Sequence, residues 1–259
     1  MMNKQNQPIA VIDSGIGGVS VLKELIKLMP NENYIYLADE KNAPYGTKTM
    51  EEVRSITVKN VEMLFGMGAK ALVVACNTAT GAAVRYLREV YPSVPIVGIE
   101  PAVKPAKEEK ENPIVLVLAT PLTLHQEKFE NLLHRFSEGA TIIPLGCPGL
   151  MEIIEDGDIE GERIDNYLTN LLKDIDKEKI DSVVLGCTHY PHAKKAIKKA
   201  FGDKVHVFDG GLGTAKEALR RIKEADLLNP SCEKGTLTLL CSEPKKERII
   251  MMLEAEENA

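Results

Sequence analysis

The sequence predicts an α/β protein made of two similar halves, each with a mainly parallel sheet. Short runs of Val, Ile, Leu and Ala alternate with longer amphipathic stretches, which is the pattern of strands covered by helices on both faces. An apolar run that ends in a cysteine occurs twice, at Cys76 and at Cys187. Cys76 lies 62 positions after Ser14, and Cys187 lies 67 positions after Thr120, and both of these earlier residues follow an opening apolar run. The second half therefore repeats the order of the first.

The strands of the first half are predicted where the chain carries short apolar runs, at 9–12, 34–37, 71–75 and 94–99. The helices between them are predicted from apolar residues spaced at i, i+3, i+4 and i+7. The first helix ends at Pro30, and the second begins at Thr49, whose capping-box partner is Glu52. The third follows Cys76 directly and is expected to turn an apolar stripe inward, made of Ala79, Ala82, Ala83, Tyr86, Leu87 and Val90.

The pattern begins again near Glu100, after which a charged segment at 107–112 is expected to be exposed. One helix of the second half opens at Cys147 and carries Glu152 and Glu155, both interpreted as solvated positions. The strands of this half are predicted at 114–118, near 142–143, at 182–185 and at 205–208. The tail is expected to pack back on the first half with a helix at 215–222, a strand at 237–240 and a last helix.

Composition argues against several classes of partner. The formal net charge of -6 disfavours nucleic acid or an anionic membrane, and the absence of Trp disfavours a stacking surface for single strands. No apolar run approaches the roughly 20 residues of a membrane span, and the polar segment at 1–8 lacks the apolar core of a signal peptide. Five cysteines without a CxxC pair or a secretion signal predict reduced thiols in the cytoplasm.

Cys76 and Cys187 are the candidates for catalysis. A single cysteine at a strand end is more often a small core residue, but two at equivalent positions change that balance. Ligands of open α/β sheets bind outside the carboxyl ends of the strands, where each cysteine is predicted at a helix N-terminus that favours a thiolate. Two thiols that face one ligand from opposite sides supply what racemisation requires, a base and a proton donor on opposite faces of one carbon. Because the α-proton of an amino acid is very weakly acidic, the site must also exclude water and stabilise charge.

Asp13 and His189 are candidates for assisting the two thiols. Asp13 ends the first strand in the half that contains Cys76 and could receive or orient the proton of that thiol, although an aspartate in a glycine-rich turn could equally be a cap. His189 lies two residues after Cys187 and could serve the second thiol similarly. Cys187, His189 and His192 could also be metal ligands, but no second ligand cluster has matching spacing, so no metal is expected.

Polar residues beside the cysteines and the first turn are candidates for binding a substrate carboxylate, because their hydroxyl and amide groups donate hydrogen bonds. They are Ser14, Asn77, Thr78 and Thr188. Tyr45 and Gly46 lie on a loop that could close over the pocket, and Pro44 gives that loop a defined shape. Ordinary turn chemistry explains each residue singly but explains the whole set less well.

Four segments resemble the motifs of bacterial glutamate racemases, in the same order along the chain. They are the segments at 11–18 (VIDSGIGG), 44–46 (PYG), 75–78 (ACNT) and 186–191 (GCTHYP). Singly these motifs are moderately specific, whereas together they are a strong indication of the family. The resemblance covers the chain from residue 9 to about residue 208.

The resemblance implies an enzyme without a cofactor that interconverts L- and D-glutamate with two bases and supplies D-glutamate for peptidoglycan. It implies two flavodoxin-like domains, 1–99 with 208–259 and an inserted domain at 100–207, and an active site in the cleft between them. Family members are often dimers, so a homodimer is also expected. By motif position, Cys76 and Cys187 match the catalytic bases, and Asp13 and His189 match assisting residues that also contact the substrate. The further matches to substrate contacts are Ser14, Tyr45, Gly46, Asn77, Thr78 and Thr188, together with Thr120 and Glu155.

Two other interpretations stay open. An aspartate racemase of the same family typically carries Cys-Thr-Glu at the second cysteine, whereas His189 stands in place of that glutamate here and favours L- and D-glutamate as substrates. A nucleotide-binding module is suggested by the glycine-rich turn at 15–18 and by Asp39 at the end of the second strand. However, Ser20 stands where the third glycine of that fingerprint belongs.

Overall fold

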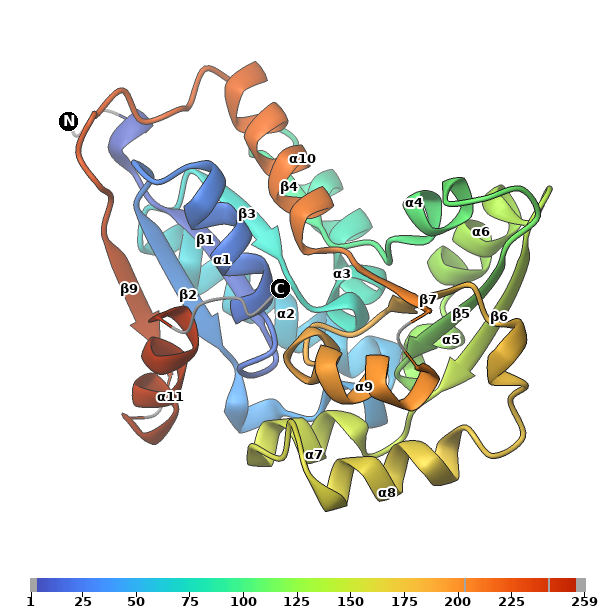
Figure 1. The fold of residues 1–259 in the computed structure, drawn as a ribbon. Helices are drawn as coiled ribbons and strands as arrows, with labels where there is room; N and C mark the ends of the chain where they lie inside the picture. The colour runs from blue at the N-terminus through green and yellow to red at the C-terminus, as the bar shows by residue number, and fades with distance from the viewer. Residues whose placement is uncertain (1–3, 203, 242, 255–259) are drawn as a thin grey trace. The chain divides into compact units, whose positions relative to one another are not determined.

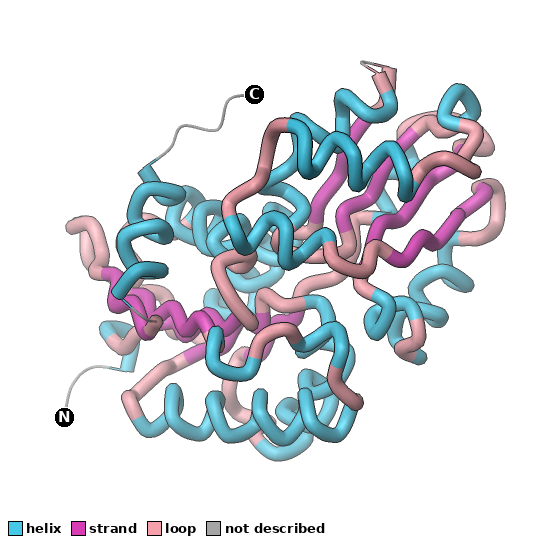
Figure 2. Tube along the Cα trace, turned by 90° about the horizontal axis from the view of Figure 1, so that it is seen from below, coloured by secondary structure: helices cyan, strands magenta, loops and turns pink. Residues whose placement is uncertain are grey.

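The computed structural model describes residues 4–202, 204–241 and 243–254, which fold as two compact units (Figure 1). The first unit joins the residues up to Ile99 to those from Gly211 onward, and the second contains Glu100–Gly210. Within each unit the strands form one sheet with helices on both faces (Figure 2). The α/β class with parallel sheets that the sequence predicts is confirmed.

The sheet of the first unit has the strand order β4-β3-β1-β2-β9, and neighbouring strands pair in parallel. Its strands are β1 (Ile9–Asp13), β2 (Tyr34–Ala38), β3 (Ala71–Val74), β4 (Ile96–Gly98) and β9 (Leu237–Leu240). The tail supplies β9 at the position where the sequence predicts a strand, and β9 pairs with β2 at the edge of the sheet.

The helices of the first unit are α1 (Val19–Leu28), α2 (Met50–Gly66), α3 (Asn77–Val90), α10 (Gly211–Glu224) and α11 (Glu243–Glu254). Short 3-10 helices occur at Lys4–Asn6, Glu40–Asn42 and Tyr45–Thr47. The predicted capping box at the start of α2 is confirmed. Thr49 Oγ1 accepts the N–H of Glu52 at 3.2 Å, and the carboxylate of Glu52 accepts the N–H of Thr49 at 2.8 Å.

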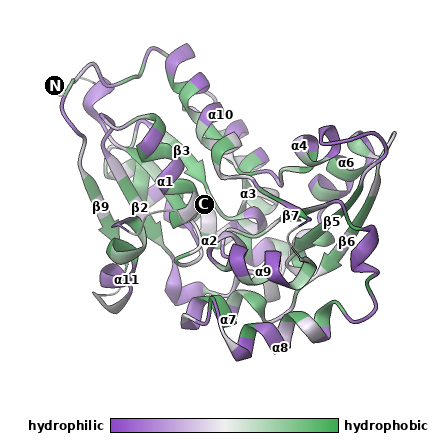
Figure 3. Ribbon diagram, in the orientation of Figure 1, coloured by the Kyte–Doolittle hydropathy of each residue, from purple (hydrophilic) through white to green (hydrophobic). Residues whose placement is uncertain are grey.

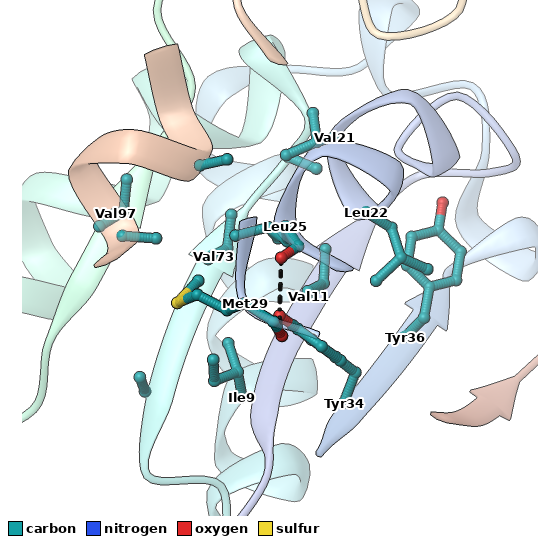
Figure 4. Close-up of a cluster of buried hydrophobic side chains, with 14 of the residues drawn as sticks. Ile9, Val11, Val21, Leu22, Leu25, Met29, Tyr34, Tyr36, Val73 and Val97 are labelled. Carbon is teal, nitrogen blue, oxygen red and sulfur yellow. Dashed lines mark hydrogen bonds between the residues drawn. The ribbon is translucent and has the colours of Figure 1, made fainter. Parts of the chain in front are cut away.

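One face of this sheet packs against α1 and α10 around an apolar core (Figure 4). Ile9 and Val11 of β1 are fully buried there. The hydroxyl of Tyr34 reaches the end of α1 and donates to the carbonyls of Leu25 and Met29, each at 2.9 Å. These contacts hold α1 against the sheet, in which β1 carries the first candidate residue at its carboxyl end.

The third helix, α3, buries four of the six residues of the predicted stripe, namely Ala79, Ala82, Ala83 and Leu87. Tyr86 and Val90 are 43% and 46% exposed, whereas Thr80, Val84 and Leu87 are buried. Tyr86 and Val90 lie near the C-terminal end of the helix, which stops at Val90. The prediction for these two residues was wrong.

The sheet of the second unit has the strand order β6-β5-β7-β8, again with parallel pairing. Its strands are β5 (Ile114–Ala119), β6 (Thr141–Gly146), β7 (Ser182–Leu185) and β8 (His206–Asp209). Its helices are α4 (Val103–Glu108), α5 (Pro121–Leu124), α6 (Glu127–Phe136), α7 (Leu150–Asp156), α8 (Glu162–Leu171) and α9 (Lys194–Phe201). The 3-10 helices are at Lys177–Lys179 and Tyr190–Ala193. The sequence did not predict α4 and α5, because they are too short to show a helical period.

The strands are the most apolar parts of both units (Figure 3). In the second unit, Leu116 and Leu118 of β5 pack toward α7, α8 and α9, and Val115 and Val117 pack toward α4 and α6. Burial on both faces explains why these strands are continuous apolar runs rather than alternating ones. No helix in the described ranges is long and apolar enough to cross a membrane.

Both sheets begin with the same topology. The chain passes from the first strand to one neighbour, β2 or β6, and then crosses to the other side of the first strand, to β3 or β7. In open α/β sheets, ligands bind at the carboxyl ends of the strands where the order reverses in this way. That point lies between β1 and β3 in the first unit and between β5 and β7 in the second.

Candidate active-site residues

In the first unit, Asp13 and Cys76 lie where the strand order reverses. Asp13 is the last residue of β1, and Cys76 follows β3 as the N-cap residue of α3. The N–H of Ala75 donates to the carbonyl of Ile12 at 2.9 Å, so the pairing of β1 with β3 extends up to the two candidates. Asp13 is fully buried, and Cys76 is only 6% exposed.

The glycine-rich turn after β1 holds Asp13 in place. Asp13 Oδ1 accepts the N–H of Gly15 at 3.0 Å, and the hydroxyl of Tyr36 donates to the carbonyl of Gly15 at 2.7 Å. A Cβ at Gly18 would lie 2.6 Å from the Cβ of Asp13 and 2.8 Å from the hydroxyl of Tyr36, so only glycine fits there. Asp13 is therefore the cap of its turn and also a neighbour of Cys76, whose titration responds to its charge.

The environment of Cys76 keeps its sulfur protonated. Burial, and after it the negative charge of Asp13, raises the pKa of this thiol to about 12. The backbone N–H groups of Ala79 and Thr78 and the hydroxyl of Ser14 oppose that rise in pKa. At neutral pH Cys76 is therefore a thiol, and forming the thiolate requires a proton acceptor.

The side-chain amide of Asn77 is buried, and its hydrogen-bonding groups are unusual among the described residues. Asn77 is 7% exposed, and within the described residues neither its Nδ2 nor its Oδ1 makes a hydrogen bond. A buried polar group that is left unpaired costs about 1–3 kcal/mol, so such groups are rare unless they serve a ligand. Ser14 and Thr78 are also buried nearby in the chain, and Gly46 is half-buried.

The hydroxyl of Tyr45 is engaged within the first unit. It donates to Asp39 Oδ2 at 2.6 Å, and burial, followed by this hydrogen bond, raises the pKa of Tyr45 above its ordinary value. The sequence analysis did not assign Asp39 a part in this site. The sequence alone gives no signal for the contact, since Asp39 and Tyr45 come together only through the shape of the loop between them.

In the second unit, Cys187, His189 and Glu155 form a chain of contacts. Cys187 follows β7, and its Sγ lies 3.9 Å from Nδ1 of His189. Nε2 of His189 lies 2.6 Å from Oε2 of Glu155, a residue of α7. His189 is 1% exposed, and the side chain of Glu155 is 15% exposed. A carboxylate on one ring nitrogen fixes the orientation and tautomer of the imidazole, so that the other nitrogen faces the thiol.

Two interpretations of this unit were wrong. Glu155 is not a solvated position, because its carboxylate contacts buried His189, whereas Glu152 on the same helix is exposed as expected. Cys187 is not at the N-terminus of an α-helix, since a turn and a 3-10 helix at Tyr190–Ala193 separate it from α9. Pro191 explains why no α-helix begins directly after Cys187, because proline has no N–H and disfavours the α conformation of the residue before it.

The remaining candidates of the second unit lie at the same strand ends. Thr188 is buried beside Cys187. Thr120 follows β5 as the N-cap of α5 and accepts the N–H of Thr123 at 3.2 Å. In the part of the chain that the structure describes, no three His, Cys, Asp or Glu side chains gather as a metal site, and this includes Cys187, His189 and His192.

Comparison with known proteins gives consistent matches over nearly the whole chain. A family model described as Asp/Glu/Hydantoin racemase matches residues 9–218. A curated glutamate racemase from Clostridium acetobutylicum is 50% identical over 241 residues, which cover 93% of this chain and 94% of that protein.

Solved structures match the fold equally broadly. The crystal structure of a glutamate racemase isoform from Bacillus anthracis is 31% identical, with a TM-score of 0.85 over 96% of this chain and 94% of that one. The crystal structure of a glutamate racemase from Francisella tularensis in complex with D-glutamate is 27% identical, with a TM-score of 0.83 over 98% of this chain and 96% of that one.

Proposed function

Because the chain belongs to the Asp/Glu/Hydantoin racemase family, we propose that it interconverts L-glutamate and D-glutamate by removing and replacing the proton on Cα. The family that the sequence motifs indicate is confirmed by these matches. Glutamate as the substrate is supported by a relative at 50% identity that is named a glutamate racemase and by a solved relative that holds D-glutamate.

One observation carries the proposed mechanism. Each unit presents a thiol at the point where its strand order reverses, and each thiol has its own proton partner. The partner of Cys76 is the buried carboxylate of Asp13, and the partner of Cys187 is the imidazole of His189. A cysteine that only fills the core would not need to lie where the strand order reverses, and it would not need an ionisable group beside it. The two features together therefore favour acid–base chemistry.

In the proposed reaction the two thiols act on opposite faces of Cα. One thiolate takes the proton, and the electron pair of the broken C–H bond stays on Cα, where the adjacent carboxylate delocalises it. The opposite thiol then gives its proton to Cα, which inverts the configuration and leaves that sulfur as the thiolate. The reverse reaction exchanges the two roles. No electrons leave the substrate, so the step requires no redox cofactor.

Asp13 and His189 prepare the thiols for this exchange. Asp13 accepts the proton of Cys76 when that sulfur acts as the base and returns it when that sulfur acts as the acid. His189, held by Glu155, does the same for Cys187. The unpaired amide of Asn77 supports a bound substrate beside Cys76. We assign the further contacts to Ser14, Tyr45, Gly46, Thr78, Thr188 and Thr120.

D-Glutamate made in this way would supply peptidoglycan synthesis in the cytoplasm, where the two catalytic thiols stay reduced. The nucleotide-binding alternative would require Asp39 to bind a ribose. Its carboxylate instead accepts hydrogen bonds from Asn42, Tyr45 and Asn60, which argues against that alternative.

The substrate is tested by measuring kcat/KM for glutamate and for aspartate with the purified protein, in a metal chelator and without added cofactor. Glutamate is expected to react roughly 10–200-fold faster, because one methylene in a fitted pocket changes the rate by about that factor. Equal or reversed rates would rule out glutamate as the preferred substrate and would favour the aspartate racemase alternative.

A further inference from the structure

We propose that Asp39 is the positioning residue for the Tyr45–Gly46 segment, acting through the side chain of Tyr45. This role rests on the proposed function, in which that segment contacts the substrate. Asp39 comes directly after β2, beside the end of β1, and its N–H donates to the carbonyl of Asp13, the last residue of β1, at 2.9 Å. The two acidic residues are therefore tied together at the carboxyl end of the sheet.

The carboxylate of Asp39 is buried and collects donors from two elements. Asp39 is 7% exposed. Asn42 Nδ2 donates to Oδ1 at 2.9 Å and to Oδ2 at 3.0 Å, the hydroxyl of Tyr45 donates to Oδ2 at 2.6 Å, and Asn60 Nδ2 donates to Oδ2 at 2.8 Å. Asn42 and Tyr45 belong to the loop, whereas Asn60 belongs to α2. Asp39 thus fastens the loop to both the sheet and a long helix.

This arrangement defines what Tyr45 can do. The only proton of its hydroxyl is committed to Asp39, and the residue is 2% exposed. Tyr45 is therefore an anchor that holds the segment in place, and its hydroxyl is not a donor to the substrate. Because three donors converge on Oδ2, loss of this one oxygen removes the hydrogen bonds of Tyr45 and Asn60 at once and leaves Asn42 only its bond to Oδ1.

Position and charge make different predictions for two variants. Asp39→Ala removes every acceptor, whereas Asp39→Asn can keep its amide oxygen at the Oδ2 position and so retain Tyr45 and Asn60. If Asp39 acts by position, Asp39→Asn should resemble the wild type and Asp39→Ala should not. If it acts by its charge on the buried thiol, the two variants should be equally impaired.

The test is amide hydrogen exchange of the segment 40–48, combined with the kinetics of glutamate racemisation. In Asp39→Ala, exchange in this segment should accelerate roughly tenfold and KM should rise roughly tenfold, with a smaller change in kcat. Asp39→Asn should stay within about threefold of the wild type in both measurements. Tyr45→Phe should loosen the same segment, and adding it to Asp39→Ala should have little further effect, because both remove the same contact.

The matched control is Asp181→Ala in the second unit. Its carboxylate also accepts two hydrogen bonds, from the N–H of Ile114 at 2.8 Å and from Nζ of Lys110 at 2.6 Å, and its removal should leave exchange in 40–48 unchanged. Unchanged exchange in both Asp39→Ala and Tyr45→Phe would overturn the proposal, as would equal impairment by Asp39→Ala and Asp39→Asn. If the wild-type protein does not racemise glutamate but exchange in 40–48 is still faster in Asp39→Ala, the proposed function is overturned. The role of Asp39 in positioning the segment would then still stand.

Discussion

Cys76→Ala and Cys187→Ala are each expected to lose racemisation of glutamate by roughly 10²–10⁴-fold or more, in both directions. Each substitution removes one of the two groups that exchange a proton with Cα. If the missing thiol is the base for one enantiomer, the α-proton of that enantiomer is not removed. If the missing thiol is the acid, the carbanion is not protonated on the opposite face, and the configuration is not inverted. The measurement is the initial rate of change in optical rotation, starting from either enantiomer.

Cys147→Ala is the matched control for these two variants. Cys147 is a buried thiol of the second unit at 2% exposure, and burial raises its pKa to about 12, as it does for Cys76. Its Sγ donates to the carbonyl of Leu145 at 3.5 Å and neighbours the buried hydroxyl of Tyr190, whereas Cys187 faces the imidazole of His189. Cys147→Ala should therefore keep the rate within about threefold of the wild type. Full racemisation by Cys76→Ala or Cys187→Ala would exclude a mechanism with two thiols.

His189→Asn is expected to lower kcat by roughly 10²–10⁴-fold, with a smaller effect on KM. The imidazole is the only group of the described second unit that we place between the Cys187 thiol and a carboxylate, and asparagine cannot carry a proton between them. Glu155→Gln should also lower kcat, because a neutral amide holds the imidazole less strongly than the carboxylate that lies 2.6 Å from its Nε2.

A control for Glu155→Gln is available on the same helix, α7. Glu152→Gln makes the same chemical change at an exposed position of α7, one turn before Glu155. It should leave kcat within about twofold of the wild type, as is usual for a substitution at an exposed position. Equal kcat values for Glu155→Gln and Glu152→Gln would show that the contact with His189 has no part in the reaction.

Local signals in the sequence were sufficient for the strands and for the positions of the two cysteines. Burial on both faces makes β1, β3, β5 and β7 continuous apolar runs, so these four strands could be placed from the sequence alone. The capping box at Thr49 was also predictable, because both of its hydrogen bonds join residues three positions apart.

Contacts between distant elements were beyond what the sequence could show. Glu155 looked like a surface residue because the feature that buries it, the turn carrying His189, lies 34 positions away. Asp39 lies 21 positions before Asn60, and no periodic pattern relates them. The 3-10 helix after Cys187 could have been foreseen from Pro191, since proline signals that the preceding residue disfavours the α conformation.

The most direct test of two opposed thiols is racemisation of one enantiomer of glutamate in deuterated water, stopped early in the reaction. Deuterium should be present at Cα of nearly all the product and absent from the recovered starting enantiomer. A thiol carries a single proton, so the base can only return the hydrogen that it removed, whereas the opposite thiol delivers deuterium from the solvent. Deuterium in the recovered starting enantiomer at the level found in the product would contradict the mechanism. It would mean that the group which removes the α-proton also delivers hydrogen from the solvent to the same face.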